Sequence, residues 1–225
     1  MDIVIDAGRV RRGTYGTITV LGNAVLEDDV TFVNLIVSGT VRCLHCHGGT
    51  VIMRSGSVFC GGDVSVERIE GHGRVTISGS LRCQTLELTG SLVARGSITA
   101  RHELFIQGLV RSGEHMAGKD VLIDGSVVSD AGMRAARSVL VRPLGGMALS
   151  RYAKDYLLGS RVESIHGAIV RLQGITCGHV TGTDVVLAGG CVVHTIRFTS
   201  RLVQDGTSSV LFIEGSRRRI HRRTA

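Results

Sequence analysis

Apolar residues recur along the chain with a period of about seventeen. The chain can be written as turns that start at residues 15, 32, 49, 66 and 83, and then at 101 and 118 after a one-residue insertion. Three columns of this alignment are almost wholly apolar: Ile18, Leu35, Ile52, Ile69, Leu86, Leu104 and Val121; Ala24, Val41, Val58, Val75, Leu92, Val110 and Val127; Val30, His47, Val64, Leu81, Ile98, Met116 and Met133. A fixed period near twenty predicts a solenoid, whose repeats bury their apolar residues by stacking.

Glycine occupies one column of the same alignment in every turn. The residues are Gly22, Gly39, Gly56, Gly73, Gly90, Gly108 and Gly125. A second series at the same spacing consists of Gly62, Gly79, Gly96 and Gly113. Because glycine adopts backbone conformations that other residues resist, we interpret both series as corners of the coil.

The spacing of the apolar columns, about six residues, indicates three short strands in each turn. Successive turns are then expected to pair as parallel strands with a rise of about 4.8 Å. A period of seventeen does not fit the multiples of six that are typical of left-handed hexapeptide helices. We therefore predict an all-β fold, a single-stranded right-handed parallel β-helix, with the left-handed form as the alternative.

The alignment divides the chain into five segments. Residues 1–14 form an N-terminal segment whose apolar run, Ile3 to Ile5, can form a first strand. Regular turns span 15–134, and an insertion spans 135–160. Within it a short helix is predicted, because Leu149, Tyr152, Ala153 and Tyr156 fall at helical spacing. Further turns span 161–214, and a basic tail spans 215–225.

The composition agrees with a β-solenoid, and the first residues indicate the cellular compartment. The 225 residues are 43% hydrophobic but only 4% aromatic, and they include 31 glycines and one proline. The first residues contain no apolar run of the length that a signal peptide or a transmembrane helix needs. We therefore expect a cytoplasmic protein whose six cysteines are reduced.

The segment Cys43-Leu44-His45-Cys46-His47 is the sharpest local motif. It matches the attachment pattern of c-type haem, and Cys43, Cys46, His45 and His47, with His72, are also candidate zinc ligands. However, the repeat already places Cys43 over Cys60 and His47 in an inward column. We therefore expect core thiols and a core imidazole, with no metal or cofactor.

Residues typical of an enzyme active site are not grouped in the sequence. Asp28 and Asp29, which follow Glu27, belong to the only run of adjacent carboxylates in the regular turns, and this run lies at the end of a turn. No Ser/His/Asp grouping or phosphate-binding glycine loop is found. We expect no enzymatic activity.

The C-terminal turns resemble those of bactofilins, the polymer-forming bacterial cytoskeletal proteins. The resemblance lies in the run VTGTDVVLAGGCVVHTIRFTSRLVQDGTSSV and in the units ISGSLRC (77–83) and IDGSVVS (123–129), and it spans residues from about 15 to 213. It implies a right-handed β-helix that assembles end to end into nucleotide-independent filaments, often attached to membrane and cell-wall machinery. The insertion at 135–160 departs from the pattern, as does the content of cysteine and histidine.

The ends of the predicted solenoid also favour assembly. Neither end has an obvious polar or helical cap, and uncapped ends of complementary shape generate filaments. We predict a polymer interface at Leu211, Phe212 and Ile213, with a second copy or a related paralogue as partner. Two alternatives stay open: a non-polymerising β-helical binding or regulatory module, as in division-site inhibitors, and a left-handed β-helical acyltransferase.

The last residues carry a large share of the net charge of +7. Arg217, Arg218, Arg219, Arg222 and Arg223 are expected to bind an anionic membrane surface or a cell-wall protein, which would make the protein membrane-associated. Because aromatic residues are scarce among them, specific nucleic-acid binding is not expected. A solvated tail without a partner is the alternative.

Overall fold

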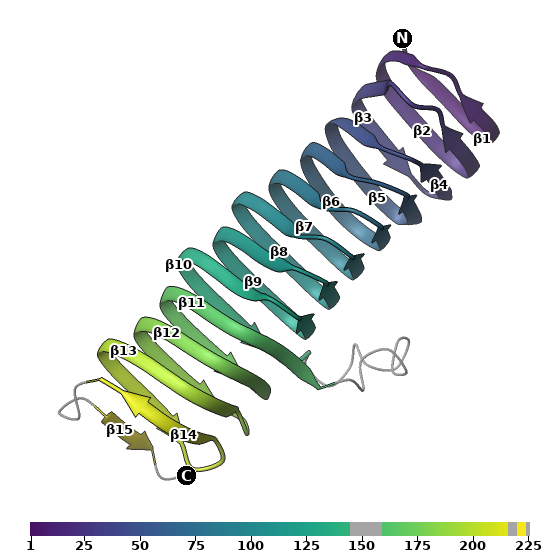
Figure 1. Cartoon of the computed structure of the whole chain (residues 1–225). Coiled ribbons are helices and arrows are strands. Elements are labelled where there is room, and N and C mark those ends of the chain that lie inside the picture. The colour runs from purple at the N-terminus through teal and green to yellow at the C-terminus, as the bar shows by residue number, and fades with distance from the viewer. Residues whose placement is uncertain (145–158, 216–219, 224–225) are drawn as a thin grey trace.

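The chain folds into a parallel β-solenoid. The computed structural model describes residues 1–144, 159–215 and 220–223. Strands stack into about 12 turns of roughly 17 residues each, and no helix occurs among these residues. Figure 1 shows a rod with the two termini at opposite ends. The predicted all-β coil and its period are confirmed.

All strands belong to one sheet that winds around the rod, and each turn pairs with the next in parallel. In chain order the strands are β1 Ile3–Val10, β2 Gly13–Leu26, β3 Val30–Val37, β4 Thr40–Cys43, β5 Cys46–Cys60, β6 Val64–Ile77, β7 Leu81–Ala94, β8 Ile98–Ser112, β9 His115–Ser129, β10 Gly132–Arg142, β11 Ser160–Gln173, β12 Ile175–Ala188, β13 Val192–Asp205, β14 Ser209–Glu214 and β15 Ile220–Arg223.

Each turn has three faces, and each face sends two side chains inward. In β7, Leu86 and Leu88 point inward from the face that we call the first face, which comprises residues 85–88 and their stacked equivalents. Leu92 and Ala94 do so from the second face, and Leu81 and Cys83 from the third. The residues between them are more exposed, as the period of two in a strand requires.

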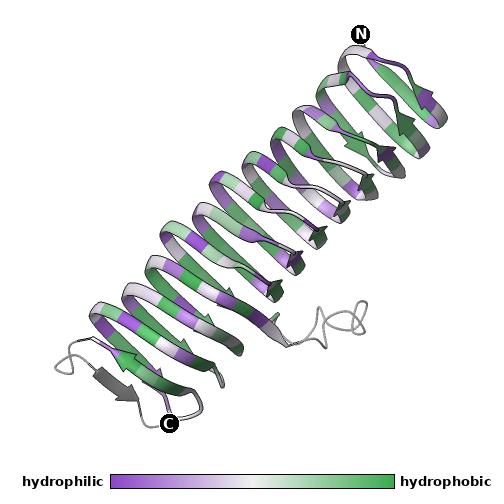
Figure 2. Cartoon of the chain, in the orientation of Figure 1, coloured by the Kyte–Doolittle hydropathy of each residue, from purple (hydrophilic) through white to green (hydrophobic). Residues whose placement is uncertain are grey.

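The inward residues of successive turns form continuous apolar columns. Parallel pairing places Val75 beside Leu92 and Leu92 beside Val110, and all three are buried. Burial of one such side chain contributes about 2 kcal/mol, so the columns are the main source of stability. Figure 2 shows the alternation of hydrophobic and hydrophilic residues along the strands.

The predicted glycine column lies at the corner between the first and second faces. Gly73 pairs with Gly90, and a methyl group added to Gly90 would overlap the carbonyl oxygen of Gly73. Gly90 also has a φ of 134°, a conformation that side chains disfavour. Close approach of stacked backbones therefore requires glycine at this corner.

The predicted core positions of His47 and Ile52 are wrong, because the corner at Leu44 and His45 is one residue shorter than the equivalent corner of the next turn. Only Leu44 and His45 separate Cys43 from Cys46, so Cys46 pairs with Val64 in the inward column and His47 points outward. Val51 likewise replaces Ile52 in the first-face column. One extra residue at Ser55, where φ is 65°, compensates for the short corner and brings the following residues back into register.

Strand pairing extends beyond the segment boundaries expected from the alignment. β1 already forms part of the coil, because Ile3 pairs with Ile18. β10 continues the coil to Arg142, and a register shift between Ala135 and Ser138 explains why the alignment ends near Arg134. Within the predicted tail, β15 pairs with β13. The helix predicted around Leu149 to Tyr156 lies outside the described residues.

Replacement of Gly90 by valine tests the glycine column. The Cβ atom would overlap the carbonyl oxygen of Gly73, and the φ of Gly90 is unfavourable for valine. We expect a loss of about 3 kcal/mol in the free energy of unfolding, measured by denaturant titration followed by circular dichroism. Gly206→Ala is the control, since an added Cβ there meets no atom within 4 Å. Equal stability of the two variants would contradict the proposed constraint.

Candidate functional site

Inward columns of the second and third faces end at the C-terminal end of the solenoid. Ile213 of β14 pairs with Ile196 of β13 and continues its column. Ile196 is 0% exposed, whereas Ile213 is 37% exposed because no described strand covers it. Val210 continues the column of the buried Val193 in the same way and is also partly exposed. This end of the rod therefore presents apolar residues that a further strand would bury.

Leu211 and Phe212 enlarge this apolar end. Their exposed fractions are 69% and 58%. The Phe212 ring lies 5.2 Å from the ring of His194, between ring centroids. Leu211, Phe212 and Ile213, which were predicted from the sequence as an interface, therefore lie together on one exposed terminal strand. Whether they bind another copy stays a prediction.

A carboxylate-capped turn holds β14 against β13. The Asp205 carboxylate accepts hydrogen bonds from the backbone N–H groups of Ser208 (2.9 Å), Thr207 (3.2 Å) and Gly189 (2.7 Å). Hydrogen bonds from Ser208 and Gly189 lower the pKa of Asp205 to about 2. The turn connects two strands of the apolar end, so the ionised carboxylate supports the position of Leu211 and Phe212.

Stability of this end is expected to depend on pH through Asp205. Since the pKa is lower in the folded state than its unfolded value of about 3.9, the carboxylate stabilises the fold above that value, and this contribution is lost as the pH falls towards 2. Asp205→Asn should therefore lower the thermal midpoint most at pH 7 and least near pH 2. Thermal unfolding between these limits, with the exposed Asp130→Asn as control, measures the difference. A constant difference across the range would contradict this role.

The N-terminal end presents the opposite edge of the same sheet. Ile3 and Ile5 of β1 are partly buried against the core, while Val4 is 71% exposed. The Asp2 carboxylate accepts a hydrogen bond from the backbone N–H of Thr17 at 2.7 Å. Among the described strands, β1 pairs only with β2. Its other edge therefore offers backbone groups to a further strand.

The cationic tail is only partly described. Arg217, Arg218 and Arg219 lie outside the described residues. The backbone of Arg222 and Arg223 belongs to β15, where these residues pair with Gln204 and Asp205. At least part of the predicted tail is therefore attached to the last turns of the coil. Its binding to an anionic surface stays a prediction.

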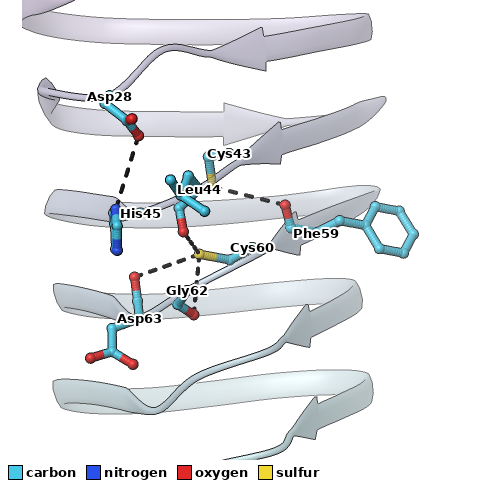
Figure 3. Close-up of polar contacts among 8 residues, drawn as sticks. All are labelled: Asp28, Cys43, Leu44, His45, Phe59, Cys60, Gly62 and Asp63. Carbon is cyan, nitrogen blue, oxygen red and sulfur yellow. Dashed lines mark hydrogen bonds and ion pairs between the residues drawn. The ribbon is translucent and has the colours of Figure 1, made fainter.

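The Cys43–His47 motif separates its thiols from its imidazoles. Cys43 and Cys46 are buried in the core, whereas His45 and His47 are exposed (Figure 3 shows Cys43 and His45). Nδ1 of His45 lies 3.9 Å from the exposed Asp28 carboxylate. Across residues 1–144, 159–215 and 220–223, no group of three or more side chains is arranged to hold a metal ion. The geometry does not fit the candidate haem or zinc site.

Cys43 and Cys60 are paired across adjacent turns and contact backbone carbonyls (Figure 3). The Cys60 thiol donates to the carbonyl oxygen of Leu44 at 3.2 Å. A hydrogen bond with the Cys46 side chain, together with burial, raises the pKa of Cys43 to about 12. A hydrogen bond with Cys43 and burial also raise the pKa of Cys60. Thiols held in the protonated form are poor nucleophiles and poor metal ligands.

The buried thiols are expected to resist modification in the folded protein. Burial raises the pKa of Cys83 and of Cys177 to about 12, so little thiolate exists at pH 8. A colorimetric disulfide reagent should react slowly with the native protein and quickly with all six cysteines in denaturant. Introducing an exposed cysteine by Ser65→Cys provides the positive control. Rapid reaction of the native wild-type protein would show that the core thiols are accessible.

A shallow groove on the third face was not anticipated from the sequence. One hollow of about 400 Å³ is lined by His115, Ala117, Gly132, Arg134, Ser164 and His166. A second of similar volume shares Ser164 and His166 and reaches His179 and Arg197. Imidazole, hydroxyl and guanidinium groups can bind anions or hydrogen-bonding ligands. The groove depends on β9 to β14 being adjacent, so the column alignment that ended at Arg134 did not show it.

Comparison with protein-family models, curated proteins and solved structures finds no match. The resemblance to bactofilins therefore stays a prediction that rests on the repeat units. Among the described residues, no helix is long and apolar enough to cross a membrane. The geometry thus leaves two candidate sites, the apolar C-terminal end and the third-face groove.

Proposed function

We propose that this protein is a structural scaffold that self-assembles end to end into nucleotide-independent filaments, as the resemblance to bactofilins implies. The observation that carries the proposal is the exposure of core columns at β14. Ile213 has the same place in its column as Ile196, yet it is 37% exposed instead of 0%. A strand from another copy would bury it as the interior turns bury Ile196.

Backbone chemistry supports the same proposal. The outer edges of β1 and β14 both carry hydrogen-bonding groups without a described neighbouring strand. Unpaired strand edges bind other strands unless charge, proline or a covering element prevents it. Because the two edges are at opposite ends of the rod, contacts between unlike ends do not close into a ring and can continue into a filament.

Recruitment of membrane or cell-wall partners is the second part of the proposal. The sequence has five arginines at 217–219 and 222–223, and the backbone of Arg222 and Arg223 pairs with β13. Near an anionic membrane each cation contributes about 1 kcal/mol, so several together give measurable binding. Attachment through this segment would place filaments on a surface without a membrane-spanning segment.

A non-polymerising binding module is the second candidate function. It is favoured by the third-face groove, where His115, Arg134 and His166 surround a hollow of about 400 Å³. Such a module would remain monomeric and bind its ligand on the side of the rod. The two functions predict different behaviour of the purified protein: a scaffold assembles into filaments, whereas a binding module stays monomeric.

Phe212→Arg tests the assembly. The substitution places a charge on the exposed terminal strand while leaving the buried columns unchanged, so the monomer should fold. We expect filaments of the wild-type protein in negative-stain electron microscopy and none, or at least a tenfold rise in the concentration needed for assembly, with the variant. Val33→Arg, at a 61% exposed site elsewhere on the rod, should still assemble. Filaments of Phe212→Arg would exclude this interface, and a monomeric wild-type protein would favour the binding module.

A further inference from the structure

The outer side of the first face carries one continuous column of mostly apolar residues. Strand pairing aligns its members in successive turns, from the N-terminal to the C-terminal end: Val4, Thr19, Ile36, Ile52, Glu70, Glu87, Phe105, Leu122, Leu140, Arg171, Val186 and Val203. These residues alternate with the inward ones, so they contribute nothing to the core. Branched or aromatic side chains at so many outward positions are not required by the coil itself.

Charged residues divide this column into three apolar blocks. Ile36 and Ile52 form the first block, which ends at Glu70 and Glu87. Phe105, Leu122 and Leu140 form the central block, which ends at Arg171, and Val186 and Val203 form the last. Acidic residues therefore precede the central block and a basic residue follows it. Reversing the direction of the column about Leu122 places Glu87 opposite Arg171 and Glu70 opposite Val186.

The neighbouring outward column that runs through Asp120, Ser138 and Asp184 is mostly polar, with Ile169 as an apolar exception, and several of its charged residues are paired within the chain. Arg137 lies 2.6 Å from Asp120, and Arg142 lies 2.8 Å from Asp124, between guanidinium nitrogen and carboxylate oxygen. Arg201 lies 3.9 Å from Asp184 in the same way. An apolar strip with a polar margin is the usual composition of a protein–protein interface. All the described strands belong to the coil, so no described strand covers the strip.

We propose that the first face binds the first face of a second copy of this chain, with the two rods antiparallel and related by a two-fold axis. Leu122 lies at the axis and meets its own equivalent. Phe105 then faces Leu140 of the second copy, Ile52 faces the second copy's Val203, and Glu87 faces the second copy's Arg171. In a parallel arrangement Glu87 would instead face Glu87 of the second copy, which like charges oppose.

The contacts within the chain select Glu87 as the partner of Arg171. Oε2 of Glu70 lies 2.8 Å from Nε of Arg68, so this carboxylate already has a close partner. Glu87 is exposed, and its nearest contact with Arg68 is longer, at 3.9 Å. Arg171 is exposed as well. The two-fold axis then forms the Glu87–Arg171 contact twice in each dimer.

The strip has the dimensions of a weak but specific interface. From Ile52 to Val203 the column extends over roughly 40 Å at about 4.8 Å per turn, and the strands of the face are about 13 Å wide. Each copy would bury on the order of 500 Å², or about 1,000 Å² for the pair, which is at the lower limit for specific complexes. We therefore expect dimers that dissociate on dilution.

Disulfide trapping tests the orientation of the two rods. Glu87→Cys and Arg171→Cys are prepared separately, mixed and oxidised with copper phenanthroline. The antiparallel dimer predicts a crosslinked heterodimer in the mixture and little crosslinking of either variant alone. Crosslinking of Glu87→Cys with itself would show a parallel arrangement, and no crosslink in the mixture would exclude the interface. Wild-type protein, whose cysteines are buried, and Thr76→Cys, on the second face, are the controls.

Charge reversal tests the energetic role of the same pair. Glu87→Arg and Arg171→Glu should each weaken the dimer at least tenfold in sedimentation, and the double variant should recover most of the loss. Arg161→Glu, an exposed residue of the second face, should leave dimerisation unchanged. Failure of the double variant to recover would overturn the pairing. All variants carry Phe212→Arg as well, so end-to-end contacts are measured separately and the two proposals can fail independently.

Discussion

Parallel stacking of backbones at a constant spacing is the constraint on which the rest of this structure depends. Each turn must lie directly on the one before it. A residue in a given column therefore contacts the residues of the same column in the preceding and following turns. At the corner of Gly73 and Gly90 the backbones approach so closely that a side chain does not fit. At the inward columns the same closeness excludes water and buries Val75, Leu92 and Val110 completely or nearly so.

The same constraint explains how the coil tolerates irregular turns. Shortening the corner at Leu44 and His45 moves Cys46 and Val51 inward, and the extra residue at Ser55 restores the register before the next glycine. The insertion between Arg142 and Ser160 is tolerated for a similar reason, since the strand Ser160–Gln173 pairs again with the turns on both sides. Changes in length are absorbed at corners because the columns on either side of them remain stacked.

A stack of identical layers has no natural end, and this connects the fold to the proposed function. An inward residue of an interior turn has a stacked neighbour on each side, whereas Ile213 has one among the described residues, which is Ile196. The outer side of the rod differs, because its residues are not needed for folding and can vary from turn to turn. On the first face the outward residues form an apolar strip that contains Glu87 and Arg171. In the proposed dimer, these two charges specify the orientation of the second rod. End-to-end and side-to-side contacts would therefore use different residues.

By itself, the sequence determined the period, the parallel coil, the glycine corners and the exposed terminal residues Leu211, Phe212 and Ile213, because these follow from spacing that repeats along the chain. Only the tertiary structure decided that Cys46 and Val51 point inward, that β10 continues to Arg142 and that β15 joins the last turns. A side chain in a strand changes sides when the register moves by one residue, and a corner can gain or lose a residue without a signal in the apolar pattern. The third-face groove and the outer strip of the first face could not be predicted for the same reason, since both depend on which residues of different turns become neighbours.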